Sequence, residues 1–84
     1  MTTLLIVLEV AGMALAKIGA AIGSSIIVLG ASYGIGKIGA TALESMARQP
    51  ESAGDIRSSM VVSAALIEGV SFFAIIICAL AILL

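Results

Sequence analysis

The feature that most constrains this chain is the arrangement of two long apolar stretches around one short polar stretch. The first runs from about Leu4 to Ala42 and the second from about Met60 to Leu84. About 20 apolar residues in a helix span the hydrocarbon of a bilayer, so the second stretch predicts one transmembrane helix. The first stretch contains no proline and its glycines keep helical spacing, so we expect one long helix that protrudes from the membrane.

Composition agrees with a membrane environment and excludes several other classes. Of the 84 residues, 62% are hydrophobic and 11% are charged, and the mean hydropathy is +1.32. A soluble domain of this size could not bury that much apolar surface. The scarce polar groups cannot furnish an enzyme pocket, and the net charge of −1 provides no basic surface for nucleic acid. The single cysteine, Cys78, can neither form an internal disulfide nor hold a metal ion alone, so we interpret it as an apolar filler.

The polar stretch predicts the turn of a helical hairpin. Pro50 cannot continue a helix, and it disfavours helical geometry at Gln49. Ser52 is a candidate N-cap for the second helix, and the carboxylate of Asp55 favours its first turn. We therefore predict an all-α fold, a single transmembrane hairpin of two antiparallel helices over residues 1–84. The first helix is expected at about 4–46, the polar loop at about 47–53 and the second helix at about 54–84.

Small residues form two stripes along the first helix. With about 100° of rotation per residue, one stripe contains Gly12, Ala16, Gly19, Gly23, Gly30 and Gly34. A second stripe, near the opposite side, contains Ala14, Ala21, Ser25, Ser32, Gly36 and Gly39. Two opposed stripes favour identical neighbours on both sides, and such a head-to-tail contact makes a closed homo-oligomeric ring if its rotation closes. The alternative is that glycine and alanine are simply common in membrane helices. The candidates for the ring contact are Gly23, Gly30, Ser32, Gly34 and Gly36.

Glu68 is the one charged residue of the second apolar stretch. A charge in mid-span costs on the order of 2.5–3.5 kcal/mol on insertion scales, so it usually marks an ion or proton path. Counted from Pro50 by equal helical distance, Glu68 lies level with about Gly30 to Ser32, near the bilayer centre. Hydrocarbon favours the protonated, uncharged form, so ionisation needs water or a fixed cation.

The source of that cation is open at this point. Lys37, about 9 Å closer to the loop, is one candidate partner within the chain. A cation from another polypeptide is the interpretation we prefer. A carboxyl group that is merely hydrogen-bonded between helices, with no ion path, is the structural alternative.

Three features together resemble the c subunits of F-type ATP synthases. They are Ala47-Arg48-Gln49-Pro50 in the loop, the run Gly-Ala-Ser-Tyr-Gly-Ile-Gly from Gly30 to Gly36, and a lone carboxylate 20 residues after Arg48. The resemblance covers roughly residues 12–84 and departs from the family's alternating glycines at Ser32. It implies a ring with the first helix inside and the second outside, built from non-catalytic, ion-carrying subunits of a complex that is itself an enzyme.

The resemblance also implies a mechanism and partners. Glu68 would take a proton from one half-channel of the neighbouring a subunit, ride protonated past membrane lipid, and release the proton into a second half-channel. An essential arginine of the a subunit would face the ionised carboxylate. Arg48, Gln49 and Pro50 would touch the gamma and epsilon subunits of the central stalk, so that rotation of the ring drives ATP synthesis.

The coupling ion follows from the same comparison. Sodium-using members carry a glutamine, two hydroxyl residues and a tyrosine at positions that align with Ile35, Gly69, Val70 and Phe73 here. In this chain three of these positions are apolar and the fourth, Gly69, has no side chain, so the oxygen ligands that sodium needs are missing. We therefore expect a proton as the coupling ion and no cofactor. The Leu66 carbonyl is the candidate acceptor for the carboxyl proton, and Ser71 is a further polar candidate unless its hydroxyl bonds back to its own helix. The neighbours expected around Glu68 are Ala31, Ser32, Ile35, Leu66, Gly69 and Phe73.

The remaining expectations concern location and competing functions. Arg48 and Arg57 flank the loop while Lys17 stands on the terminal side, which favours a cytoplasmic loop and outside termini in a bacterial inner membrane. The start of the chain lacks the basic region of a secretory signal, so we expect it to be retained. The alternatives are a sodium-coupled ring of the same family, a small pore-forming hairpin and an accessory hairpin of a larger transporter. The pore leaves Glu68 unexplained, and the accessory hairpin leaves the opposed stripes and the loop motif unexplained.

Overall fold

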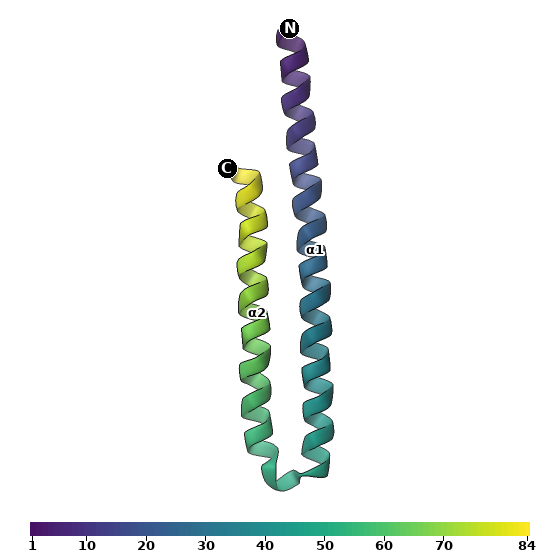
Figure 1. The fold of residues 1–84 in the computed structure, drawn as a ribbon, viewed down its shortest axis with the longest axis vertical. Helices are drawn as coiled ribbons and strands as arrows, with labels where there is room; N and C mark the ends of the chain where they lie inside the picture. The colour runs from purple at the N-terminus through teal and green to yellow at the C-terminus, as the bar shows by residue number, and fades with distance from the viewer.

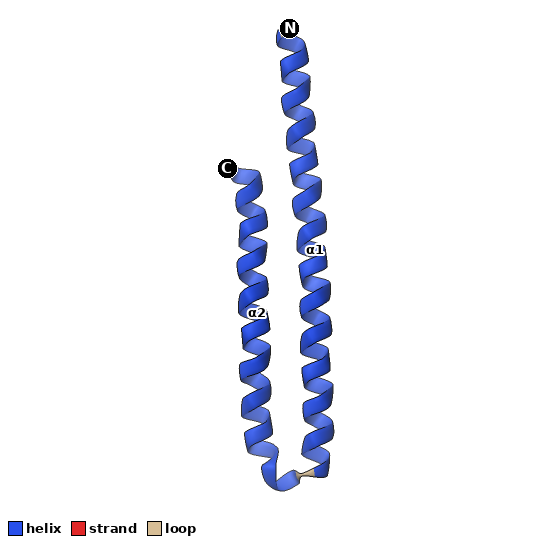
Figure 2. Cartoon of the chain, viewed as in Figure 1, coloured by secondary structure: helices blue, strands red, loops and turns tan.

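The computed structural model describes all 84 residues as a helical hairpin (Figure 1; Figure 2). Helix α1 covers Thr2–Arg48, a single 3-10 turn η1 covers Pro50–Ser52, and helix α2 covers Ala53–Leu83. α2 runs back beside α1 from the turn, and the N-terminal end of α1 extends well past the end of α2 (Figure 1). The predicted all-α hairpin of two antiparallel helices is confirmed.

α1 is longer than the sequence pattern predicted, α2 has the expected length but lies one residue earlier, and the turn is shorter. α1 begins at Thr2 and ends at Arg48, and α2 already begins at Ala53. Only Gln49 lies between α1 and η1. The expected loop included Ala47 and Arg48, but both are good helix formers, and proline restricts only the residue directly before it.

The geometry of the turn follows from the chemistry of proline. Gln49 adopts φ −130° and ψ 68°, outside the helical region that the following proline disfavours. Pro50 is the first residue of η1. An N–H group at this position would have no acceptor within the helix, so its absence in proline costs no hydrogen bond. Ser52 occupies the predicted N-cap position of α2 but makes no side-chain capping bond; its backbone N–H instead donates to the Gln49 carbonyl at 2.9 Å. The turn is therefore closed by backbone geometry, with Asp55 in the first turn of α2.

Two glycines of α1 define the register between the helices. A Cβ added to Gly23 would lie 3.6 Å from Sγ of Cys78, and one added to Gly34 would lie 3.1 Å from Cδ1 of Ile67. The interval is eleven residues on each helix (23 to 34, and 67 to 78), so the antiparallel register holds without slip. Two of the expected ring-contact glycines therefore face the chain's own second helix, where the missing side chains permit a close approach.

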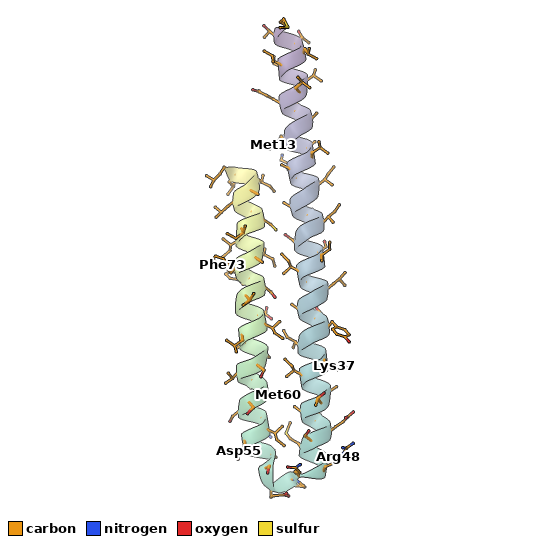
Figure 3. All side chains as sticks on the ribbon, viewed as in Figure 1. Met13, Lys37, Arg48, Asp55, Met60 and Phe73 are labelled. Atoms are coloured by element: carbon orange, nitrogen blue, oxygen red, sulfur yellow. The ribbon has the colours of Figure 1, made fainter.

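Almost none of the hairpin is buried within itself. Ala42 is the one buried residue, with 8% of its surface exposed, whereas Leu29 and Val70 are 70% and 71% exposed. Figure 3 shows side chains projecting outward along both helices. So much apolar surface must be covered by lipid or by other chains.

Both helices are long and apolar enough to cross a membrane. The hairpin extends 73 Å along its longest axis, whereas a bilayer with its head groups is about 40–45 Å thick. The register places Leu83, the last residue of α2, level with Ile18 of α1. As expected, the first helix is longer than one membrane span, and its extra length lies on the side away from the turn (Figure 1).

Candidate functional site

Glu68 lines a groove between the two helices, on one side of the hairpin. We call this the Glu68 groove. It has a volume of about 250 Å³ and is lined by Val28, Ala31, Ser32 and Ile35 of α1 and by Glu68, Ser71, Phe72 and Ile75 of α2. The Glu68 side chain is exposed in the single hairpin. The only other polar side chains of the groove are the hydroxyls of Ser32 and Ser71.

The height of Glu68 can be read from the helix register. Extending the Gly34–Ile67 contact by one residue on each helix puts Glu68 level with Tyr33. The expected level was Gly30 to Ser32, so the carboxylate lies at least one residue, about 1.5 Å, closer to the turn. The small-residue run from Gly30 to Gly36 therefore lies beside the carboxylate, at the height where the groove forms.

The three neighbours expected from α1 line the Glu68 groove. Ala31, Ser32 and Ile35 all do so, together with Val28. Their spacing of three and four residues keeps them on one face of the helix. Ser32, the departure from the family's glycine pattern, contributes a hydroxyl to the same groove as the carboxylate.

The three neighbours expected from α2 do not line the groove. Leu66 lines another groove, described below, and neither Gly69 nor Phe73 lines the Glu68 groove. Phe72 occupies the place expected for Phe73, because four residues after Glu68 complete about one helical turn, whereas five overshoot it by about 140°. The spacing of three, four and seven residues after Glu68 is the signal that would have found Ser71, Phe72 and Ile75.

The hydroxyl of Ser71 is not engaged by its own helix. Back-bonding occurs elsewhere: Ser25 Oγ donates to the Ala21 carbonyl at 2.8 Å, and Ser58 Oγ donates to the Gly54 carbonyl at 3.1 Å. Ser71 makes no such bond, although the same geometry was the expected alternative for it. Its hydroxyl is therefore available within the Glu68 groove.

A second groove lies at the same level on the opposite side of the hairpin. It has a volume of about 440 Å³ and is lined by Gly30, Ala31, Leu66, Ile67, Val70 and Ser71. Leu66 is two residues before Glu68 and so lies about 200° around the helix from it. Ala31 and Ser71 line both grooves, which places them at the contact between the helices. Each hairpin thus presents the carboxylate on one side and an apolar surface on the other.

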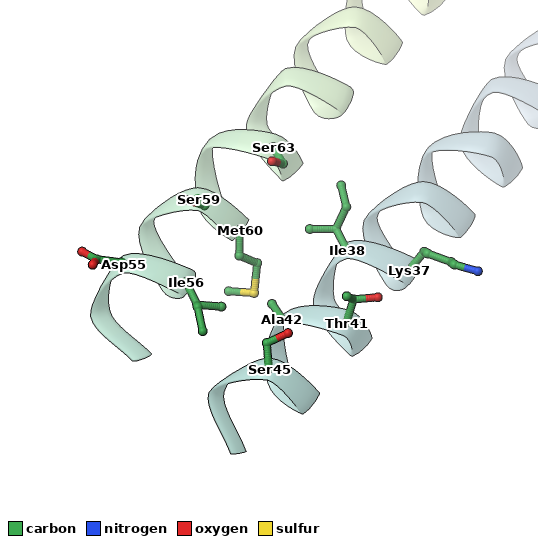
Figure 4. A pocket seen from close by; sticks show the side chains of 10 residues that line it. All are labelled: Lys37, Ile38, Thr41, Ala42, Ser45, Asp55, Ile56, Ser59, Met60 and Ser63. Atoms are coloured by element: carbon green, nitrogen blue, oxygen red, sulfur yellow. The ribbon is translucent and has the colours of Figure 1, made fainter. Parts of the chain in front are cut away.

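Lys37 does not line the Glu68 groove. It lines a third groove of about 480 Å³ nearer the turn, and Figure 4 shows its ammonium group directed away from α2. The register puts Lys37 level with Ala64, about 6 Å closer to the turn than Glu68. The candidate pairing of Lys37 with Glu68 within one chain is therefore not made in this structure.

The other predicted residues lie on open surface. Gly30 and Gly36 would have nothing within 4 Å of an added Cβ, so both leave space for a neighbouring chain. Arg48, Gln49 and Pro50 are exposed at the turn, at the far end of the hairpin from both termini (Figure 3, where Arg48 is labelled). No three His, Cys, Asp or Glu side chains gather to hold a metal ion.

Comparisons with known proteins agree on one family. The family model for the C subunit of ATP synthase matches residues 18–81. A protein of Phocaeicola vulgatus that is named as an ATP synthase c subunit is 57% identical over 74 residues, covering 88% of each chain. The Bacteroides thetaiotaomicron protein of the same name is 54% identical over 70 residues, covering 83% of this chain and 82% of its own. The Enterococcus hirae protein of that name is 42% identical over 60 residues, covering 71% of this chain and 84% of its own. No solved structure gives a significant match. The chain belongs to the family of ATP synthase c subunits.

Proposed function

We propose that this chain carries protons on Glu68 as one protomer of a rotor ring, and that the movement of these protons is coupled to ATP synthesis. Membership of the family makes the chain a ring-forming membrane hairpin of an ATP synthase, an ion-transporting subunit that is not itself catalytic. The observation that carries the proton assignment is the Glu68 groove, in which one carboxyl group stands among mostly apolar side chains.

The lining of the groove favours a proton over sodium. A hard cation needs several oxygen ligands around it, as metal sites built from carboxylates, carbonyls and water provide. Beside the carboxylate the groove offers two hydroxyls, from Ser32 and Ser71, while Ile35 stands where sodium-using relatives of the family would place an amide. A proton needs no such shell, because a protonated carboxyl is neutral and requires only a hydrogen-bond acceptor.

The carboxyl group must alternate between two states for transport. Facing lipid it is neutral, since an uncompensated charge in hydrocarbon is costly. Releasing the proton requires water and a cation, and no cation of this chain lines the groove. We infer that an arginine of the neighbouring a subunit supplies it, with the two half-channels of that subunit delivering and removing the proton.

The turn of the hairpin supports the proposed rotor contact. Arg48, Gln49 and Pro50 are exposed and held in a compact backbone turn. A rigid, exposed turn with one cation and one amide suits docking onto the gamma and epsilon subunits of a central stalk. Arg48 and Arg57 on this side favour a cytoplasmic turn, and the bacterial relatives favour a bacterial inner membrane.

The test is labelling by dicyclohexylcarbodiimide in membranes that contain the assembled complex. This apolar reagent modifies protonated carboxyl groups, so Glu68 is expected to react at neutral pH and to lose reactivity at high pH. Sodium is expected to leave the rate unchanged, and protection by sodium would instead identify a sodium-coupled ring. A Glu68 that does not react, or reacts equally at every pH, contradicts the proposal.

A further inference from the structure

We propose that Arg57 of one copy docks beside Asp55 of the next copy, and that this ion pair fixes the contact between ring neighbours near the turn. The proposal requires a ring of identical hairpins, which the family provides. It is independent of which ion Glu68 carries.

The docking position is the groove nearest the turn, which we call the Asp55 groove. It has a volume of about 480 Å³ and is lined by Lys37, Ile38, Thr41, Ala42, Ser45, Asp55, Ile56, Ser59, Met60 and Ser63. Figure 4 shows the Asp55 carboxylate at its edge, directed away from α1. The carboxylate is therefore open to a chain that approaches from outside.

Helix geometry places this groove and the Glu68 groove on opposite sides of the hairpin. Ser59 lines the Asp55 groove and lies nine residues before Glu68, which is about two and a half turns. Arg57 lies eleven residues before Glu68, about three turns, so it shares the side of α2 that carries Glu68. The two residues from Asp55 to Arg57 amount to about 200° of rotation, so their side chains point apart within one copy.

Neither charge forms an ion pair within its own chain, and the only side-chain hydrogen bonds of the hairpin are those of Ser25 and Ser58. Residues two apart on a helix do not face each other, which excludes a pair between Asp55 and Arg57 of the same copy. The register puts Asp55 level with Met46, about 13 Å from the level of Lys37. Both groups are thus free to pair between copies.

A ring brings these charges together. Copies related by rotation about an axis normal to the membrane keep the same height, and each presents its Glu68 side to the opposite side of its neighbour. Arg57 then meets the Asp55 groove with a vertical offset of about 3 Å. A guanidinium has five donors, so besides the carboxylate it can donate to the hydroxyls of Ser59 and Ser45.

Glu44 provides the decisive control. The register puts Glu44 of α1 level with Arg57, so it is the other acid at this height. Glu44 does not line the Asp55 groove. We therefore assign the contact to Asp55.

The experiment compares charge reversals in the assembled complex. Arg57→Glu and Asp55→Lys alone are each expected to lower the temperature at which the purified ring dissociates in detergent, and the double variant is expected to restore it. Arg57→Glu with Glu44→Lys is expected not to restore it. The proposal is overturned if the single reversals leave the dissociation temperature unchanged, or if Glu44→Lys is the change that rescues Arg57→Glu.

A cross-link decides the matter if the reversed chains fail to assemble. Asp55→Cys and Arg57→Cys are combined in a Cys78→Ala background and treated in membranes with a short bis-maleimide. Head-to-tail docking predicts a ladder of oligomers from the double variant and at most dimers from each single variant. Equal patterns from all three overturn the proposal. Carbodiimide labelling of Glu68 in the same samples separates this result from the proposed function, since the label depends on Glu68 and not on the Arg57 contact.

Discussion

Gly34 and Ile67 meet where α1 and α2 approach, with 3.1 Å between a Cβ added to Gly34 and Cδ1 of Ile67. That distance is tighter than an ordinary carbon contact, so the isoleucine must already shift for a methyl group, and a branched side chain must push the helices apart. We expect Gly34→Val to destabilise the assembled ring by about 1–3 kcal/mol per contact, the usual range for overpacking. Thermal dissociation of the purified ring in detergent measures the effect.

The matched changes separate packing from backbone effects. Ile67→Ala removes the obstructing atom, so it is expected to recover much of the stability lost in Gly34→Val. Gly54→Ala is expected to leave the packing of α1 against α2 unchanged, because no atom of the hairpin lies within 4 Å of a Cβ added there. A Gly34→Val ring that dissociates at the wild-type temperature would show that the helices are not this close.

This contact also shows how far the sequence determines the fold. Pro50 placed the turn, because it excludes helical geometry at Gln49 and so separates two apolar segments of spanning length. The two small-residue stripes of α1 could not be ranked in the same way. Both stripes consist of small residues, and α2 contacts one of them through Ile67 and Cys78, which belong to no small-residue stripe of their own. Nothing in the pattern therefore identified which stripe α2 would cover.

The Glu68 groove shows a second limit. Ala31 and Ser32 of α1 were predicted from their height, which depends only on helix geometry, whereas Ile35 came from the family's pattern of sodium ligands; all three line the groove. Phe73 was expected from a pattern of sodium ligands in the family, and that pattern concerns positions that bind in a ring. In the hairpin alone, the residue one turn after Glu68 is Phe72.

Phe72 and Phe73 form a natural control pair for the groove. They are 65% and 64% exposed, but only Phe72 lines the Glu68 groove. Phe72→Ala removes an apolar wall and admits water beside the carboxyl group, which favours its charged, unreactive form. We expect carbodiimide labelling at a fixed neutral pH to be slower in Phe72→Ala than in the wild type. Phe73→Ala is expected to label at the wild-type rate, and equal slowing in both variants would argue against the placement of Phe72.

Sodium binding should be obtainable by restoring oxygen ligands. We expect the combined variant Ile35→Gln, Gly69→Ser, Val70→Thr and Phe73→Tyr to show carbodiimide labelling that sodium slows, because an amide at position 35 would project into the Glu68 groove. Potassium at equal concentration is the control for ionic strength. Phe73→Tyr alone should remain insensitive to sodium, since one hydroxyl cannot complete a coordination shell. Sodium protection of the wild-type chain would contradict the proton assignment.

Replacing Glu68 by glutamine tests the central role of the carboxyl group. Glutamine has nearly the same shape, and it is neutral, so it avoids the charge that is costly in hydrocarbon. The ring is therefore expected to assemble with at least its normal stability. An amide cannot release and rebind a proton at accessible pH, so ATP-driven proton pumping into inverted membrane vesicles should fall to the background of vesicles without the complex. Glu44→Gln, which removes an exposed acid of α1 near the turn, should pump normally. Normal pumping by an assembled Glu68→Gln complex would mean that the proton passes through some other group.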